Sequence, residues 1–296
     1  MNGFFNIMKP PGMTSAAVVA VMRRLTGEKR VGHAGTLDPE AAGVLPVMAG
    51  KAARLFDYLV DKEREYEAVC AFGSSTDTQD ATGTVLETGD CYPDIETVRE
   101  KAQELVGEII QRPSMYSAIK VGGKPLYVRA RKGETVEVPE RTVTIYGIDV
   151  IGEEPDHAVR MKVRCGKGTY IRTLCDDLGK ECGCPAHMRS LVRTKSGAFT
   201  IDTAITPDEA RELAARGELT GRMMPPDAPL GHIPRVDVPE RFRKMVVNGA
   251  KVPAGEACGD IAPEQIVRVY LAGEFWGIAQ NQGDVLVWKA LIAPEG

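Results

Sequence analysis

The 296-residue chain lacks the long apolar runs that mark membrane proteins, and its first residues do not follow the pattern of an export signal. No run approaches the roughly 18 consecutive apolar residues that a membrane-spanning helix needs. Residues 1–9 show no basic stretch followed by an apolar segment and a small-residue cleavage site, so no signal peptide is expected. The sequence therefore predicts a cytoplasmic protein with no membrane partner.

Motifs for several common chemistries are also missing. The sequence contains no Walker A motif, no GxGxxG after a strand, no HExxH and no GxSxG. Four histidines leave little room for metal sites or catalytic triads, and seven scattered cysteines, an odd number, argue against a disulfide framework. Cys182 and Cys184 form a lone CxC without a second pair at zinc-ribbon spacing, so no metal site is expected.

The formal net charge of −4 gives no general sign of nucleic-acid binding, but the cations are clustered. The segment 112–133 contains six Lys or Arg residues and no acid, with Tyr116 and Tyr127 between them. Clustered cations with aromatics suit a phosphate backbone and unstacked bases, whereas a solvated charged face normally mixes signs. The alternating basic residues of strand 159–165 would extend this patch. The glycines of the segment suggest that it orders only on binding.

Periodicity and capping signals predict a mixed α+β chain. Prolines gather between Pro225 and Pro239, which indicates a domain boundary followed by an all-β module. Helices are expected at 16–25, 52–60, 94–106, 171–178 and 206–216, and strands at 66–72, 159–165, 267–271, 275–279 and 285–291.

Asp38 stands in an unusual loop, residues 32–46, that is punctuated by glycine and proline. Because Asp38 precedes Pro39, its backbone is biased toward an extended conformation, which aims the carboxylate. The neighbouring glycines allow a ligand to approach closely. The alternative is a loop aspartate that only caps a turn.

Two further residues invite a functional interpretation. Arg172 is expected in the first turn of its helix, where a cation opposes the helix dipole and favours an external anion. The alternative is an exposed surface arginine. Tyr66 opens a strand between charged neighbours, and taken alone it is typical of a half-buried strand tyrosine.

Taken together, these segments resemble the TruB-type tRNA pseudouridine-55 synthases of bacteria over most of the chain. The most specific block is GTLDP at residues 35–39. The other matching blocks, in the family's order, are residues 9–15, the rest of the 32–46 loop, the Tyr66 strand, and residues 76–83, 116–120, 168–174 and 191–194. Departures at Pro113-Ser114 and Val192 concern RNA docking and leave the catalytic set whole.

The resemblance implies an α/β (mixed α+β) pseudouridine synthase fold with a mostly antiparallel central sheet. It places the catalytic domain at residues 1–232, with a tRNA-clamping insertion at about 112–140. Residues 233–296 would form a small all-β, PUA-like RNA-binding domain. A monomer that needs no protein partner is expected.

The resemblance also implies roles for individual residues. Asp38 falls on the essential carboxylate, Tyr66 on the tyrosine that packs against the target base and acts as general base, and Arg172 on the arginine that pairs with the aspartate. His33 would accommodate the rearranged RNA loop, and Tyr170 and Leu191 would line the base pocket. Further substrate contacts are expected from Lys9, Lys120, Arg129 and Arg131.

The implied reaction converts uridine 55 in the TΨC loop of tRNA to pseudouridine. The N1–C1′ bond breaks, the uracil turns and rejoins through C5, so no external donor, cofactor or metal is needed. The nucleotide must be flipped out of its stack, which costs a few kcal/mol. Asp38 must be ionised to act, and Arg172 within about 4–6 Å would favour the charged form.

Three alternatives differ in class or substrate. A guide-RNA-dependent pseudouridine synthase would share the GTLDP region but lack the clamp and need protein partners. A non-catalytic RNA chaperone would leave uridine unchanged, and the intact trio of Asp38, Tyr66 and Arg172 speaks against lost chemistry. A glycoside hydrolase would need a second carboxylate near Asp38, for which only Glu40 is a candidate.

Overall fold

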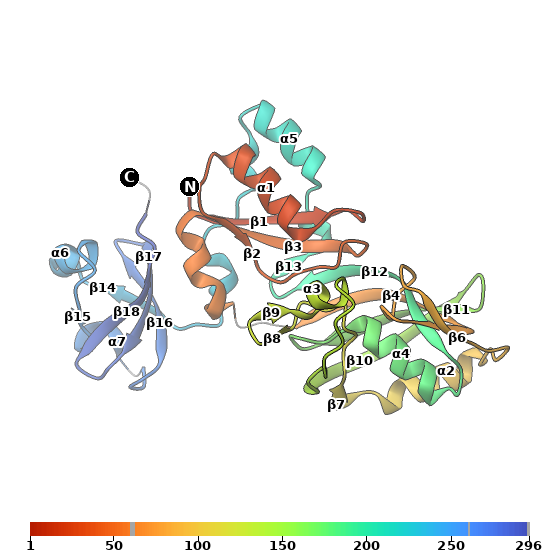
Figure 1. Cartoon of the computed structure of the whole chain (residues 1–296). Coiled ribbons are helices and arrows are strands. Elements are labelled where there is room, and N and C mark those ends of the chain that lie inside the picture. The colour runs from red at the N-terminus through yellow and green to blue at the C-terminus, as the bar shows by residue number, and fades with distance from the viewer. Residues whose placement is uncertain (60–62, 260, 295–296) are drawn as a thin grey trace. The chain divides into compact units, whose positions relative to one another are not determined.

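The computed structural model describes residues 1–59, 63–259 and 261–294 (Figure 1). The chain divides into two compact units. The first combines Met1–Pro39, Gly43–Asp61 and Gly197–Gly296, and the second combines Glu40–Ala42 with Lys62–Ser196. Both ends of the chain thus belong to one unit, while the middle of the chain builds the other.

A small sheet and two helices open the first unit. Strand β3 (Ala42–Ala49) pairs antiparallel with both β1 (Gly3–Lys9) and β2 (Val31–His33). Helices α1 (Ser15–Thr26) and α5 (Pro207–Ala215) lie side by side and share an apolar core with these strands (Figure 1). The strand and helix residues meet in this core because each element has one apolar face.

The boundaries of α1 and α5 follow from local capping chemistry. The Thr14 hydroxyl accepts from the amide of Ala17, and Gly27 ends α1 in the left-handed region at φ 67°. A capping box joins Thr206 and Glu209 at the start of α5. Both helices are confirmed to within a residue or two of their predicted bounds.

The helix expected at 52–60 is a 3₁₀ helix, η1 (Gly50–Tyr58), and Val60 lies outside the described residues. Ala52 and Leu55 are fully buried, and Tyr58 packs against the same apolar cluster. A spacing of three suits a 3₁₀ helix, in which side chains at i and i+3 lie on one line.

The C-terminal part of the first unit is a five-stranded sheet in the order β14-β16-β17-β18-β15. The β14–β16 pair is parallel and the other pairs are antiparallel. The strands are β14 (Arg235–Val238), β15 (Val252–Pro253), β16 (Ile266–Leu271), β17 (Glu274–Asn281) and β18 (Val285–Leu291). The expected β module is confirmed.

This module is not all-β, because short helices α6 (Arg243–Val247) and α7 (Gly255–Cys258) interrupt it. Phe242, Met245 and Val246 follow helical spacing, and all three pack in the module's apolar cluster. The pattern is too short to stand out in the sequence.

The second unit is built on a sheet in the order β12-β4-β11-β10-β7. Helices α2 (Ile95–Glu104) and α4 (Ile171–Glu181) pack against this sheet (Figure 1). The strands are β4 (Arg64–Phe72), β7 (Gly107–Gln111), β10 (Arg141–Glu154), β11 (Ala158–Cys165) and β12 (Ala186–Ser196). Each of these neighbouring pairs is antiparallel.

The mixed α+β fold class is confirmed. The central-sheet pairs named above are antiparallel, but the central sheet taken as a whole is mixed, which corrects the expectation of a mostly antiparallel sheet. Alternating apolar and polar residues predict a strand and its buried face. They do not specify the direction of the neighbouring strand, which depends on the chain's connections.

The basic face predicted for β11 is present, but Arg160 and Lys162 are paired with acids. Arg160 lies 2.6 Å from Glu154 and 3.7 Å from Glu67, and Lys162 lies 3.2 Å from Glu65. These acids come from neighbouring strands, so the sequence of β11 alone does not reveal them. Arg160 and Lys162 therefore add little positive charge to an RNA-binding surface.

Two smaller hairpins complete the second unit. Strands β5 (Ser74–Thr76) and β6 (Val85–Thr88) form one. The other lies in the predicted insertion, where β8 (Lys120–Val121) and β9 (Lys124–Pro125) turn at Gly122 and Gly123 and lead into α3 (Leu126–Ala130). No helix in the described ranges is long and apolar enough to cross a membrane.

Candidate active site

The loop that carries Asp38 is fixed on its N-terminal side by Ser15, the first residue of α1. The Ser15 hydroxyl accepts from the amide of Leu37 at 3.0 Å and donates to the Leu37 carbonyl at 3.2 Å. Ser15 and Leu37 are both buried, while Asp38 is half-buried. The residue before the carboxylate is therefore held by both of its backbone groups.

The C-terminal side of the same loop is fixed by Lys9 and Gly12. The Pro39 carbonyl accepts from the Lys9 ammonium at 2.8 Å and from the Gly12 amide at 3.0 Å. Lys9 is fully buried and also donates to the carbonyls of Pro10 and Met13. The structure thus gives Lys9 a role in holding the Asp38 loop, and its predicted contact with substrate stays a prediction.

His33 is the last residue of β2 and belongs to the same unit as Asp38. It is half-buried and stands opposite Val47 of β3. The first unit therefore carries Lys9, His33 and Asp38. Tyr66 and Arg172 belong to the second unit, and the predicted pairing of Asp38 with Arg172 stays a prediction.

Tyr66 lies on β4 directly opposite Arg193 of β12. Both side chains are buried, with 6% and 1% of their surface exposed, and the guanidinium is hydrogen-bonded to the phenol oxygen. Burial raises the pKa of Tyr66, and the charge of Arg193 opposes that rise. The hydroxyl is therefore protonated at neutral pH.

Arg172 is buried at the start of α4, with 5% of its surface exposed. Its Nη1 lies 3.4 Å from a carboxylate oxygen of Asp80 and donates to the Thr78 carbonyl at 3.0 Å. Its Nη2 donates to the Tyr116 carbonyl at 3.2 Å. The interpretation of Arg172 as an exposed surface arginine is wrong, and these contacts fix the direction of its guanidinium.

Asp80 is organised by the tight turn in which it stands. Its carboxylate accepts from the hydroxyls of Thr78 and Thr82 at 2.8 and 2.6 Å. Gln79 adopts φ 62°, and its side chain accepts from Thr173 at 2.8 Å. The block at residues 76–83 therefore holds the arginine from one side.

Two residues predicted to line the base pocket lie in the second unit. Tyr170 is the N-cap residue of α4, and both of its backbone groups are hydrogen-bonded to the side chain of Gln111. Leu191 is buried on β12, opposite Ala68. It stands two residues before Arg193.

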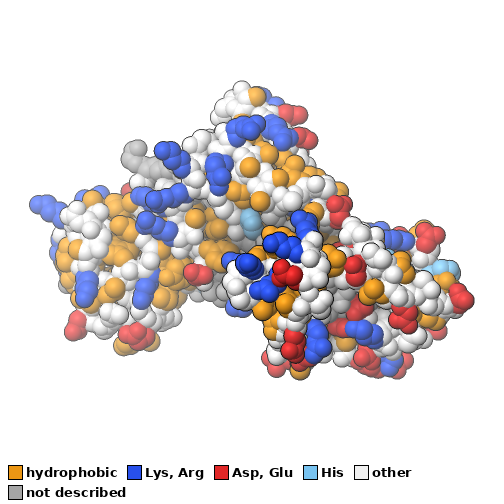
Figure 2. Space-filling view, viewed as in Figure 1, with side chains coloured by type: hydrophobic (Ala, Val, Ile, Leu, Met, Phe, Trp, Pro, Cys, Tyr) orange, Lys and Arg blue, Asp and Glu red, His pale blue; other side chains and the backbone are white. Residues whose placement is uncertain are grey.

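The cations expected to contact RNA differ in their surroundings within the insertion. Figure 2 shows Lys and Arg side chains gathered over the region of β8, β9 and α3. Lys120 is exposed, and Arg131 is exposed beside the Tyr127 ring at 5.7 Å. Arg129 is half-buried and donates to the Val121 carbonyl at 3.1 Å. Arg129 therefore contributes to the fold of the insertion.

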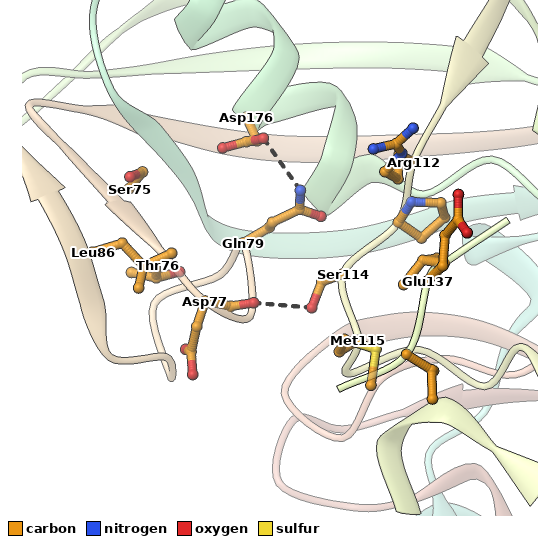
Figure 3. A pocket seen from close by; sticks show the side chains of 13 residues that line it. Ser75, Thr76, Asp77, Gln79, Leu86, Arg112, Ser114, Met115, Glu137 and Asp176 are labelled. Atoms are coloured by element: carbon orange, nitrogen blue, oxygen red, sulfur yellow. Dashed lines mark hydrogen bonds between the residues drawn. The ribbon is translucent and has the colours of Figure 1, made fainter. Parts of the chain in front are cut away.

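A cavity of about 400 Å³ lies in the second unit between the β5 turn, the two arms of the insertion and α4 (Figure 3). Gln79 points to Asp176 and donates to it at 3.2 Å, and the Ser114 hydroxyl donates to the Asp77 carbonyl at 3.0 Å (Figure 3). None of the predicted catalytic residues is among its lining residues. The cavity shows instead how the insertion is anchored beside the Asp80 turn.

Sequence reasoning missed three residues that organise the predicted site: Arg193, Asp80 and Gln111. A signal existed for Arg193, because its position in the alternating strand 186–196 puts a charge on the same face as Leu191. Asp80 lies in the matching block 76–83, but its partner Arg172 is distant in sequence, as Tyr170 is from Gln111, so no local pattern pointed to either contact. The described residues contain no group of three or more metal-ligating side chains that could hold an ion.

Known proteins share both the sequence and the fold. A sequence model of "TruB family pseudouridylate synthase (N terminal domain)" matches residues 23–171, and one of "tRNA pseudouridylate synthase B C-terminal domain" matches residues 172–230. The chain is 43% identical over 286 residues to tRNA pseudouridine synthase B of Alkaliphilus oremlandii, covering 95% of this chain and 94% of that one. It is 42% identical to the Bacillus licheniformis protein of the same name, covering 91% and 89%.

Among solved structures, an H/ACA ribonucleoprotein bound to a substrate RNA containing 2′-deoxyuridine has a chain with TM-score 0.72 and 25% identity, covering 99% of this chain and 85% of that one. A Cbf5-Nop10-Gar1 complex has a chain with TM-score 0.70 and 28% identity, covering 96% and 83%.

These matches define an RNA-modifying isomerase. The chain belongs to the TruB family of pseudouridylate synthases, and its activity is the formation of pseudouridine in tRNA.

Proposed function

We propose that this enzyme isomerises uridine 55 in the TΨC loop of tRNA, with Asp38 as its catalytic carboxylate. The observation that carries the proposal is the fixation of the Asp38 loop. Ser15 holds Leu37 on one side, and Lys9 with Gly12 holds Pro39 on the other. A carboxylate on a loop held from both sides is preorganised, as catalysis requires.

Asp38 acts as the nucleophile at C1′ or C6, or as the base that removes the proton at C2′. Each route needs the ionised carboxylate. Arg172 favours that form by supplying positive charge. The contacts of Arg172 with Asp80, Thr78 and Tyr116 hold the guanidinium in one orientation, so the charge is presented without reorganisation during the reaction.

Tyr66 packs against the flipped uracil, and its oxygen takes up the C5 proton after the new bond forms, directly or through a water, while its own hydroxyl proton passes to solvent. Because burial raises the pKa of Tyr66, the phenol is neutral when the base arrives. Arg193 is bonded to the same oxygen and lowers the cost of negative charge on it. Stacking on the ring, with Leu191 and Tyr170 as walls, offsets the cost of flipping.

The insertion at about 112–140 clamps the tRNA arm through exposed cations that include Lys120 and Arg131.

We further propose that residues 1–232 act as catalytic domain and 233–296 as a PUA-like domain that contacts the acceptor end. The enzyme would act as a cytoplasmic monomer. Replacing exposed Lys244 and Lys251 by Met should weaken tRNA affinity while turnover at saturation is kept; unchanged affinity would contradict the role of the C-terminal domain.

The deciding experiment incubates the protein with an unmodified tRNA transcript without metal or nucleotide. Pseudouridine is then mapped by chemical labelling and primer extension. One modification at position 55, absent with Asp38→Asn but present with the control Asp57→Asn on η1, supports site and residue together. Tight binding without modification would favour an RNA chaperone instead. Modification at another position would overturn the specificity.

A further inference from the structure

The predicted insertion leaves the sheet after Gln111, the last residue of β7, and returns at Arg141, the first residue of β10. Gln111 and Arg141 are direct cross-strand partners. The root of the RNA-clamping segment is therefore one residue pair within an antiparallel ladder. Both members of this pair contact Tyr170, although neither is near it in sequence.

Gln111 holds the backbone of Tyr170. Its side chain is fully buried, Nε2 donates to the Tyr170 carbonyl at 3.2 Å, and Oε1 accepts from the Tyr170 amide at 2.9 Å. The amide group thus uses a donor and an acceptor on the two backbone groups of one residue. Because Tyr170 has no side-chain cap bond of its own, these two contacts fix where α4 begins.

Arg141 contacts the ring of the same tyrosine. Its Cζ lies 5.7 Å from the Tyr170 ring centroid, within the range of a cation–π contact. The buried Nε of Arg141 has no hydrogen-bond partner within the ranges that the structure describes. A buried donor costs stability unless it is paired, so the favourable contact of this guanidinium that the structure shows is the one with the Tyr170 ring.

We propose that Gln111 and Arg141 are positioning residues that hold Tyr170 against the target base. Through them, the position of Tyr170 depends on whether RNA is bound to the RNA-clamping insertion. The proposal rests on the proposed function, which puts Tyr170 in the base pocket. A second contact supports the link, because the insertion also reaches Arg172 through the Tyr116 carbonyl. When RNA docks on the insertion, these contacts then fix the position of Tyr170 at the N-terminus of α4.

The first test separates turnover from binding. Arg141→Met and Gln111→Met should each lower kcat at saturating tRNA by about tenfold, since small displacements of positioning groups are costly. The tRNA dissociation constant should change less than about threefold. Arg141→Lys should recover part of the loss because it keeps the charge. The control Arg99→Met, at an exposed position of α2, should leave both constants unchanged. Weaker binding with kcat intact would make Arg141 a phosphate contact and overturn the proposal.

A double-mutant cycle tests whether the pair acts through Tyr170. If it does, Arg141→Met has little further effect on kcat in a Tyr170→Leu background. Additive losses would overturn the proposal. Gln111→Met could fail to fold, but the Arg141 cycle stands without it.

Hydrogen exchange gives a readout that is independent of activity. The Tyr170 amide, bonded to Gln111, should exchange more slowly when tRNA binds the wild type, and this slowing should be lost in Arg141→Met. An equal slowing in both proteins would overturn the positioning role. If the wild type bound tRNA but left uridine 55 unchanged, the proposed function would fail, while the exchange result would still decide the positioning role.

Discussion

The hydroxyl of Ser15 is hydrogen-bonded to both backbone groups of Leu37, the residue that immediately precedes Asp38. One side chain at the start of α1 therefore fixes the backbone that presents the carboxylate. The same hydroxyl stands next to Thr14, which caps the helix. The position of Asp38 consequently depends on where α1 begins.

Ser15→Ala should lower kcat about tenfold and leave tRNA affinity nearly unchanged, because Asp38 loses its fixed backbone. The free energy of unfolding should fall by about 1–3 kcal/mol, since two buried backbone groups lose their partner. Single-turnover kinetics and urea unfolding measure the two effects. Thr206→Ala is the control, because it removes a helix cap of about 1 kcal/mol away from the Asp38 loop. An equal loss of kcat in the control would show that the effect is only one of stability.

Arg193→Met should destabilise the protein by about 1–3 kcal/mol, because the buried Tyr66 hydroxyl loses a hydrogen-bond partner. Adding Tyr66→Phe removes the orphaned hydroxyl, so the double variant should lose less stability than the two single losses added together. Chemical unfolding of the four proteins measures the coupling. Strict additivity would mean that the two side chains contribute independently.

The raised pKa of Tyr66 predicts a loss of stability at alkaline pH. The folded state holds the phenol proton more tightly than the unfolded state does. As the pH rises through about 10, the ordinary tyrosine value, the unfolded state loses this proton first and is favoured. The free energy of unfolding should therefore fall from pH 9 to 11, and less steeply in Tyr66→Phe. If the free energy of unfolding fell equally steeply in the two proteins, ionisation of Tyr66 would not be the cause.

Lys120→Met and Arg129→Met should separate RNA contact from support of the insertion. Lys120 is exposed, so its loss should weaken tRNA binding and reduce the slope of log affinity against log salt by about one. Arg129 is bonded to the Val121 carbonyl, so its loss should instead increase proteolysis within residues 116–134. Binding titrations at several salt concentrations and limited trypsin digestion measure these effects. Identical salt slopes for Lys120→Met and wild type would rule out a phosphate contact.

Local signals predicted much of the fold. Thr14, Gly27 and the Thr206–Glu209 box locate α1 and α5 because capping depends on neighbours in sequence. The direction of strands in the central sheet could not be predicted from alternation. The acids beside Arg160 and Lys162 also escaped prediction, since they lie on other strands.

The candidate site likewise divides into features that local sequence predicts and contacts that depend on distant residues. Sequence motifs identified Asp38, Tyr66 and Arg172 as candidate catalytic residues, and their roles remain proposals. Their supporting partners were not predictable: Asp80 lies 92 residues before Arg172 in the sequence, and Lys9 lies 30 residues before Pro39. Only the folded chain brings such partners together, and a buried lysine is unexpected from composition.

The assembly of the first unit from both chain ends has a consequence for synthesis on the ribosome. Residues 62–196 emerge as a nearly complete unit, while the opening strands await α5 and the bridge from Phe4 to Met224. Protease treatment of stalled nascent chains about 230 residues long should therefore find the middle protected before the beginning. During translation the earliest-made strands would close their core later than the middle of the chain does, so the loop that carries Asp38 reaches its final structure after the RNA-clamping insertion has folded.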